Sequence, residues 1–132
     1  MILVDTSTWV EFDRATGSSA HLRLAELIRE GSDEIAVTEP VLAELLAGVR
    51  RDDDARRVRR LVTSFGWVHA DVVADFEGAA KVYRSCRAAG ITPRGLIDCM
   101  IASIAIRAGA ELLAADRDFE AMASVVPLRL AA

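Results

Sequence analysis

Ile2-Leu3-Val4-Asp5-Thr6-Ser7 is the most informative segment of this 132-residue sequence, because three strongly apolar residues lead directly into a carboxylate and two hydroxyl side chains. A short apolar run is typical of a strand buried on both faces, and Asp, Thr and Ser favour helix starts. We therefore predict a strand at 2–4 and a helix that begins near Thr6. Asp5 then lies at the carboxyl end of a buried strand.

The same alternation of short apolar runs and longer helical segments continues along the chain. Further strands are expected at 35–37, 67–69, 112–114 and 128–130. Further helices are expected at 20–29, 39–49 with Thr38 as N-cap, 52–65, 72–89, 96–108 and 118–123. Short apolar strands separated by helices indicate a parallel sheet covered on both faces. We predict a single α/β domain over residues 1–132, a three-layer α/β/α sandwich around a short parallel sheet.

Composition narrows the class of protein. Hydrophobic residues make up 52% of the chain, yet no apolar run approaches the roughly 20 residues of a membrane span. The N-terminal apolar run is too short for a signal peptide, so a cytoplasmic protein without membrane contact is expected. Cys86 and Cys99 have no zinc-site or disulfide spacing, and we expect both to be small buried apolar side chains.

Arginine is unevenly distributed in a chain whose net charge of −4 argues against nucleic-acid binding. Lys81 is the single lysine of the sequence, and six arginines fall within one short segment: Arg50, Arg51, Arg56, Arg57, Arg59 and Arg60. A guanidinium group can donate two hydrogen bonds to one phosphate. A high-GC genome and an ordinary solvated helix face explain the same enrichment, so both interpretations stay open.

Four of the 20 acidic residues stand in apolar surroundings. Asp5 and Asp116 directly follow predicted strands, whereas Glu44 and Asp98 interrupt apolar helices. Each has an ordinary explanation: an N-cap for Asp5, a turn for Asp116, a polar helix edge for Glu44, and for Asp98 a first-turn acid or a partner of Arg94. An isolated charge in a buried helix is unfavourable unless it is paired or bound to metal, which favours a functional role for Asp98.

The remaining acids need no special chemistry. Asp75 belongs to a group expected at helix ends or on polar faces, and Asp118 is expected to be the N-cap of the helix at 118–123.

Taken together, the four acids predict a metal site. In parallel sheets, ligands bind beyond the carboxyl ends of the strands. Convergent carboxylates raise each other's pKa values, and Mg²⁺ or Mn²⁺ relieves that repulsion. Carboxylate-held metals can cut phosphodiester bonds. His21 and His69, the two histidines, fall away from these acids in the sequence, which argues against histidine-based RNA cleavage and against a zinc hydrolase.

Two alternatives remain at this point. One is an aspartate-phosphorylating α/β domain, which also has acids and Mg²⁺ at its strand ends. Phosphatases of that kind need a second aspartate at the position of Ser7. Receiver domains need a lysine on a strand, whereas Lys81 lies in a predicted helix. The other alternative is a non-catalytic module that binds RNA or protein.

The sequence resembles the PIN-domain family, and within it the VapC-type toxins of bacterial toxin–antitoxin pairs. The matching segments run in the family's order and span nearly the whole chain: residues 2–7, 37–48, 96–102 and 112–119. The resemblance implies a five-stranded parallel α/β/α sandwich. It also implies a homodimeric, metal-dependent endoribonuclease toxin that cleaves cellular RNA and arrests growth. A small cognate antitoxin neutralises such toxins by covering the site.

The resemblance also assigns residues. Asp5 and Asp98 would be the principal Mg²⁺ (or Mn²⁺) contacts, Glu44 and Asp116 would complete the acidic site, and Ser7 would hydrogen-bond within it. Hydrolysis would leave a 5′-phosphate and a 3′-hydroxyl. The arginines at 50–60 would hold the RNA backbone or contact the antitoxin. One departure is visible, because Ala114 stands where the family often has a hydroxyl residue two positions before the fourth acid.

Overall fold

The computed structural model describes residues 1–131 and confirms the α/β class. Its strands are β1 (Ile2–Val4), β2 (Ile35–Val37), β3 (Gly66–Trp67), β4 (Glu111–Leu113) and β5 (Arg129–Leu130). Its helices are α1 (Thr6–Arg14), α2 (Ser19–Arg29), α3 (Glu39–Gly48), α4 (Asp52–Val62), α5 (Val72–Ala88), α6 (Leu96–Ala108) and α7 (Asp118–Ala123).

All strand pairs in the sheet are parallel, in the order β3-β2-β1-β4-β5. The central strand β1 pairs with β2 through Ile2 and Ile35, and with β4 through Ile2 and Glu111. The chain moves outward from β1 to one edge, returns, and then builds the other edge. The strand order therefore reverses between β1 and β4, which is where an open parallel sheet forms a ligand crevice.

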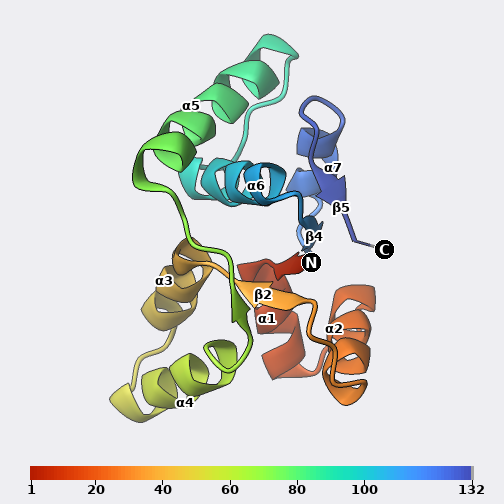
Figure 1. The fold of residues 1–132 in the computed structure, drawn as a ribbon, viewed down its shortest axis with the longest axis vertical. Coiled ribbons are helices and arrows are strands. Elements are labelled where there is room, and N and C mark those ends of the chain that lie inside the picture. The colour runs from red at the N-terminus through yellow and green to blue at the C-terminus, as the bar shows by residue number, and fades with distance from the viewer. Residues whose placement is uncertain (132) are drawn as a thin grey trace.

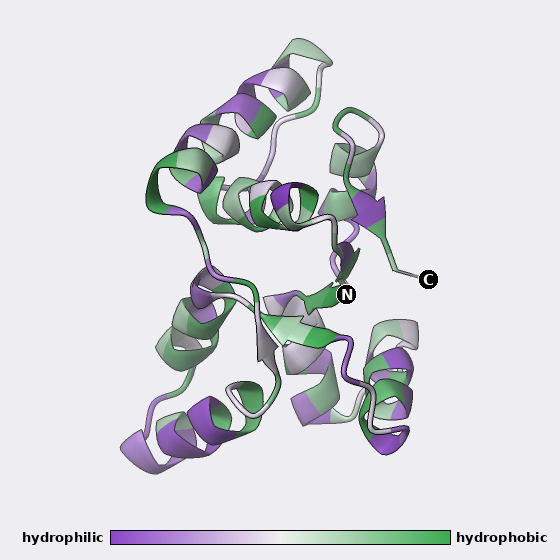
Figure 2. Cartoon of the chain, viewed as in Figure 1, coloured by the Kyte–Doolittle hydropathy of each residue, from purple (hydrophilic) through white to green (hydrophobic). Residues whose placement is uncertain are grey.

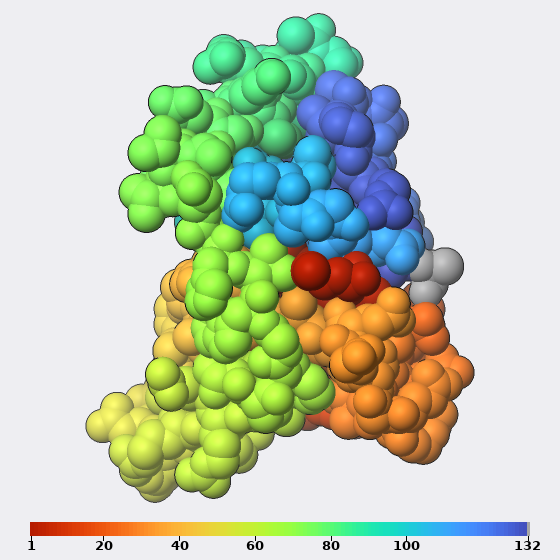
Figure 3. Space-filling view, in the orientation of Figure 1, coloured from red at the N-terminus to blue at the C-terminus, as the bar shows by residue number. Residues whose placement is uncertain are grey.

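Helices cover both faces of the sheet. Helices α1 to α4 lie on one side and α5 to α7 on the other, with the strands between them (Figure 1). In the space-filling view these two helical layers form two lobes, and the first residues of the chain reach the surface between them (Figure 3). The segment after β3 carries the chain from one layer to the other (Figure 1).

The core is formed by the strands and by the helices packed on them. Helix α6 and strands β1 and β2 are strongly hydrophobic, whereas α4 is mostly hydrophilic (Figure 2). Leu3, Val4 and Ile101 are fully buried, and so are Cys86 and Cys99, as expected from the sequence. In the described part of the chain, no helix is long and apolar enough to cross a bilayer.

The largest boundary error falls between α4 and β3. A helix was predicted through Phe65, but α4 ends at Val62 and β3 is Gly66–Trp67 instead of 67–69. The hydroxyl of Thr63 donates to the carbonyl of Arg59, and the backbone N–H of Thr63 donates there as well. Side-chain bonds of this kind compete with the helical pattern and end α4 one turn early.

Two predicted caps also differ. Thr38 occupies the N-cap position of α3, but its hydroxyl makes no capping bond and instead contacts the Glu39 carboxylate. Asp118 is the first residue of α7, whose N-cap position is occupied by Arg117. The Asp118 carboxylate is therefore available for a contact outside its own helix.

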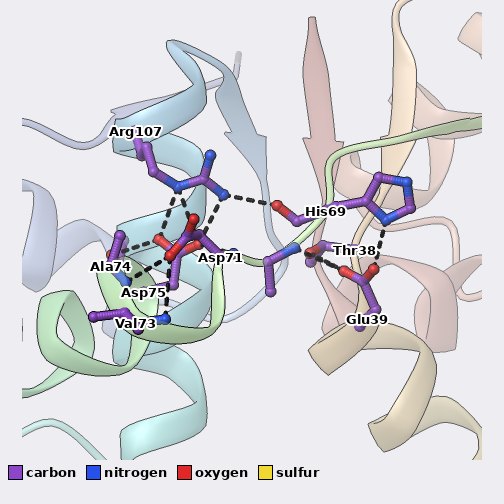
Figure 4. Close-up of polar contacts among 10 residues, drawn as sticks. Thr38, Glu39, His69, Asp71, Val73, Ala74, Asp75 and Arg107 are labelled. Carbon is purple, nitrogen blue, oxygen red and sulfur yellow. Dashed lines mark hydrogen bonds and ion pairs between the residues drawn. The ribbon is translucent and has the colours of Figure 1, made fainter.

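Asp75 lies at a helix end, in the first turn of α5, but its side chain is fully buried between α5 and α6 and does not belong to a polar face. Arg107 of α6 donates to both carboxylate oxygens of Asp75, at 2.7 to 3.1 Å, and Ser103 donates to one of them at 3.0 Å. The backbone N–H of Asp71 adds a further bond (Figure 4). Burial alone raises the pKa of Asp75, but these bonds outweigh it and hold that pKa below its usual value.

The Asp75–Arg107 pair extends to the other helical layer through the segment 69–71. Arg107 donates to the carbonyl oxygen of His69 at 2.7 Å. On the opposite side, Glu39 of α3 accepts from the backbone N–H of Ala70 at 2.8 Å and lies 2.6 Å from Nδ1 of His69 (Figure 4). The crossing between the layers is thus fixed to α3 at one end and to α6 at the other.

Replacing Arg107 by Met is expected to lower the free energy of unfolding by about 3 kcal/mol near neutral pH, because it leaves Asp75 buried and unpaired. A carboxyl with a depressed pKa contributes stability above its unfolded pKa of 3.8 and loses it as the pH falls further, so the loss should shrink only in acid below about pH 4. Urea unfolding at both pH values measures this. The double variant Arg107→Met/Asp75→Leu is the control and should recover part of the loss. An equal loss in the single and double variants contradicts the account.

Candidate functional site

Asp5 begins the site at the carboxyl end of β1, where its backbone N–H donates to the carbonyl of Leu113 in β4 at 2.9 Å. It is also the N-cap of α1, and its Oδ2 accepts from the backbone N–H of Ser7 at 3.0 Å and from the Ser7 hydroxyl. The ordinary explanation and the functional one therefore both apply to this residue, since the cap uses one oxygen only.

The other carboxylate oxygen of Asp5 has no such role. Oδ1 is buried and has no hydrogen-bond partner among residues 1–131. Burial raises the pKa of Asp5, the bonds from Ser7 oppose that rise, and the nearby Glu44 carboxylate adds to it. A buried carboxylate oxygen without a partner is unfavourable, and a bound cation would remove the penalty.

Ser7 joins the first strand to the loop after β4. Its hydroxyl donates to Asp5 and accepts from the backbone N–H of Ala115 at 3.0 Å. Thr8 adds a second tie, since its buried hydroxyl donates to the carbonyl of Leu113 at 2.8 Å. These bonds hold the segment that precedes Asp116 against the β1–α1 corner.

Glu44 approaches the site from α3. The hydroxyl of Thr6 donates to its Oε1 at 2.6 Å, which ties the carboxylate to the residue next to Asp5. From its position in the sequence, Thr6 is predicted only to begin a helix. Its adjacency to Asp5 was visible, but its contact with a residue 38 positions away was not.

Asp98 lies in the first turn of α6, and its electrostatics show that the acids converge. Its pKa is raised to about 6, first by burial and then by repulsion from Asp5, Glu44, Asp116 and Asp118. The other three acids singled out in the sequence therefore act on Asp98 through space. Asp118 joins them as a fifth acid, which was not expected.

Asp116 stands on the loop between β4 and α7. Its Oδ1 accepts from the backbone N–H of Asp118 at 2.9 Å, and its Oδ2 lies 3.6 Å from Nη1 of Arg94. Nε of Arg94 lies 3.0 Å from Oδ2 of Asp118. The sequence predicts Arg94 as one possible partner of Asp98, but the structure pairs it with Asp116 and Asp118 instead.

The donor set fits a hard divalent cation. It consists of carboxylate oxygens, which Mg²⁺ and Mn²⁺ prefer, and it includes the unpartnered Oδ1 of Asp5. Across residues 1–131, no three acidic, histidine or cysteine side chains are already grouped as a ready ligand set. Binding an ion would therefore draw the carboxylates closer together. Ala114 offers no hydroxyl here, so the side-chain hydroxyls nearest these acids come from Thr6 and Ser7.

The arginines at 50–60 lie beside the site and not in it. All six side chains are exposed on α4 or just before it: Arg50, Arg51, Arg56, Arg57, Arg59 and Arg60. Arg51 and Arg56 pair with Asp53, and Arg57 lies 3.3 Å from Asp13 of α1. Arg57 also lines a groove between α1, α3 and α4 that has Glu44 and Thr6 in its wall.

The chain is similar to the PIN domain and to proteins named ribonucleases. The model of the PIN domain matches residues 2–125. Ribonuclease VapC11 of Mycobacterium tuberculosis is 42% identical over 131 residues, which cover 99% of this chain and 98% of that protein. Ribonuclease VapC19 of the same species is 38% identical over 117 residues, 86% of each chain.

Solved structures with the same fold are more distant in sequence. VapBC2 from Rickettsia felis, bound to a DNA fragment from its promoter, matches with a TM-score of 0.75 at 20% identity, over 99% of this chain and 98% of that one. VapC20 of Mycobacterium tuberculosis, a toxin that cleaves the sarcin-ricin loop, matches with a TM-score of 0.68 at 22% identity, over 98% and 99%.

Removing the charge of Asp98 is expected to stabilise the metal-free protein at neutral and mildly alkaline pH. A raised pKa means that ionised Asp98 opposes folding above that pKa, and a shift from 3.8 to about 6 corresponds to at most about 3 kcal/mol. The gain from Asp98→Asn should disappear as the pH falls toward the usual carboxyl range. Thermal unfolding in EDTA across pH measures it.

The same variant should lose stabilisation by added Mn²⁺, which the wild type should show. Glu77→Gln is the matched control, because Glu77 is exposed on α5. If Asp98→Asn destabilises the metal-free protein at alkaline pH, the acids do not repel as described.

Proposed function

The chain belongs to the PIN-domain family, and from that membership we propose that it is a metal-dependent endoribonuclease acting as the toxin of a toxin–antitoxin pair. The observation that carries the proposal is the unpartnered, buried Oδ1 of Asp5 amid acids that raise the pKa of Asp98. Such an arrangement opposes folding unless a cation neutralises it. The relatives named ribonucleases, which match nearly the whole chain, indicate RNA as the substrate.

The side chains divide the work by their positions. Asp5 and Asp98 would hold Mg²⁺ or Mn²⁺. Asp5 offers a buried oxygen without a partner, and the pKa of Asp98 is raised by the other acids of the site. Glu44 and Asp116 would complete the acidic site and orient water, and Thr6 and Ser7 keep their carboxylate partners in place. A bound divalent ion supplies the activation of water and the neutralisation of charge on the phosphate. Hydrolysis would leave a 5′-phosphate and a 3′-hydroxyl.

We further propose a cognate antitoxin as the regulatory partner. A toxin–antitoxin complex from Klebsiella pneumoniae shares this fold, as does VapBC2 from Rickettsia felis. The groove between α1, α3 and α4 supports the proposal, because Phe12, Leu45 and Leu61 give it apolar walls and Glu44 stands in it. A peptide segment seated there would cover the acids from one side. Mutual exclusion of RNA and antitoxin at Glu44 would then explain neutralisation.

A homodimer in the cytoplasm completes the proposal. Val72, Val73 and Phe76 form an exposed apolar patch on the first turns of α5, which a second copy of the chain could cover. Both cysteines are free, as is usual in a reducing compartment. Light scattering on the purified protein decides the assembly, and the mass of a single copy would contradict the dimer.

Cleavage of a total cellular RNA pool tests the proposed activity. We expect discrete fragments with Mg²⁺ or Mn²⁺ and intact RNA in EDTA. Asp98→Asn and Asp5→Asn should each lower cleavage by at least about 100-fold, since changing even an outer-shell partner of a metal site reduces activity by 10- to 100-fold. Glu77→Gln should behave as wild type. Activity that survives both EDTA and Asp98→Asn would refute the carboxylate mechanism. A wild-type protein that does not bind Mn²⁺ would indicate a non-catalytic module.

The α4 arginines are proposed to hold the RNA backbone. Replacing Arg56, Arg57 and Arg60 by Ala should flatten the salt dependence of RNA binding by about 0.7 in log–log slope for each lost phosphate contact. Fluorescence anisotropy with a short single-stranded RNA measures the slope. A slope equal to that of the wild type would rule out RNA binding by these arginines.

A further inference from the structure

Arg94 is the one basic side chain within ion-pair distance of the acidic site in residues 1–131. It lies on the loop between α5 and α6, four positions before Asp98, and its guanidinium contacts Asp116 and Asp118. No arginine, lysine or histidine of the described chain pairs with Asp5, Glu44 or Asp98. An approaching RNA phosphate therefore meets five carboxylates and a single protein cation at this edge of the sheet.

Stability does not account for the position of Arg94. Its side chain is 72% exposed, and an exposed ion pair contributes about 0 to 1 kcal/mol. Arg107 shows the contrast, because it binds both oxygens of a fully buried carboxylate and fixes a chain crossing. Arg94 forms one contact at 3.0 Å and one at 3.6 Å, each to a partly exposed acid.

The guanidinium group also keeps donors for a second partner. Nε is the nitrogen nearest to Asp118 and Nη1 the one nearest to Asp116, and two such contacts do not use all five N–H donors of a guanidinium group whose side chain is 72% exposed. The planar fork of arginine suits phosphate oxygens, which accept two parallel bonds. A side chain anchored on one edge and solvated on the other can bind phosphate without leaving the site.

We propose that Arg94 is a substrate-contacting residue that binds an RNA phosphate beside the acids while remaining held by Asp116 and Asp118. The inference rests on the proposed ribonuclease function and adds a residue that the acidic pattern does not reveal. Asp116 then belongs to the acidic site and also positions the arginine, whereas Asp118 positions the arginine. A divalent ion and Arg94 would share the neutralisation of the RNA backbone.

RNA binding without cleavage tests the contact. Anisotropy of a short fluorescein-labelled single-stranded RNA is measured in Ca²⁺ at several salt concentrations, and a gel checks that the RNA stays intact. Arg94→Ala should weaken binding and flatten the salt dependence by about 0.7 in log–log slope, the value for one phosphate contact on a single strand. Arg94→Lys keeps the charge, so its slope should match the wild type although its affinity falls. Arg84→Ala, an exposed arginine on α5, is the matched control.

Mn²⁺ affinity of the RNA-free protein separates this role from a merely structural one. Arg94 and an ion compete for Asp116, so Arg94→Ala should bind Mn²⁺ at least as tightly as the wild type. If Arg94→Ala leaves the salt slope of RNA binding unchanged, the inference is overturned. It is also overturned if Arg94→Ala lowers Mn²⁺ affinity in step with RNA affinity, because Arg94 would then only position Asp116. A wild type that binds Mn²⁺ but no RNA contradicts the proposed function itself.

Discussion

The buried carboxylate of Asp5 is the constraint around which this molecule is built. It lies at the end of the central strand, where one of its oxygens caps the N-terminus of α1 and the other has no partner among the described residues. An apolar environment makes its charge unfavourable, yet its neighbours on the adjoining elements are acids as well. The fold therefore concentrates negative charge at the edge of the sheet where the strand order reverses. The stability and the chemistry of the protein depend on how that charge is compensated.

Two arginines bind acidic residues of this fold in different ways. Arg107 lies away from the acids and ties α6 to the chain crossing at His69, while Glu39 ties the same crossing to α3. These helices carry Asp98 and Glu44, so the bonds at the crossing connect the supports of two site residues on opposite faces of the sheet (Figure 4). Arg94 contacts the acids directly but is mostly exposed. One arginine thus belongs to the framework and the other to the surface that a substrate meets.

Local pattern was sufficient for much of the architecture and for the acids themselves. Apolar triplets such as Ile2–Val4 become buried strands because no other element hides three consecutive apolar side chains as simply. Asp98 was recognisable because its neighbours in sequence are apolar. The errors arise where a distant partner decides. The sequence predicts only a helix end or a polar face for Asp75, because Arg107 and Ser103, which bind it, are about 30 positions away. The contacts of Arg94 with Asp116 and Asp118 are likewise between residues distant in sequence.

The register of the central strand has a consequence for how the protein is made. Ile2 pairs on one side with Ile35 but on the other with Glu111, so half of the sheet that supports Asp5 comes from the distal part of the chain. Contacts of such long sequence separation form late in folding. A nascent chain from which β4 has not yet emerged carries Asp5 and Glu44, but it lacks Asp116 and the strand whose Leu113 carbonyl accepts from the backbone N–H of Asp5. The acidic site therefore stays incomplete until β4 has been synthesised and has paired with β1.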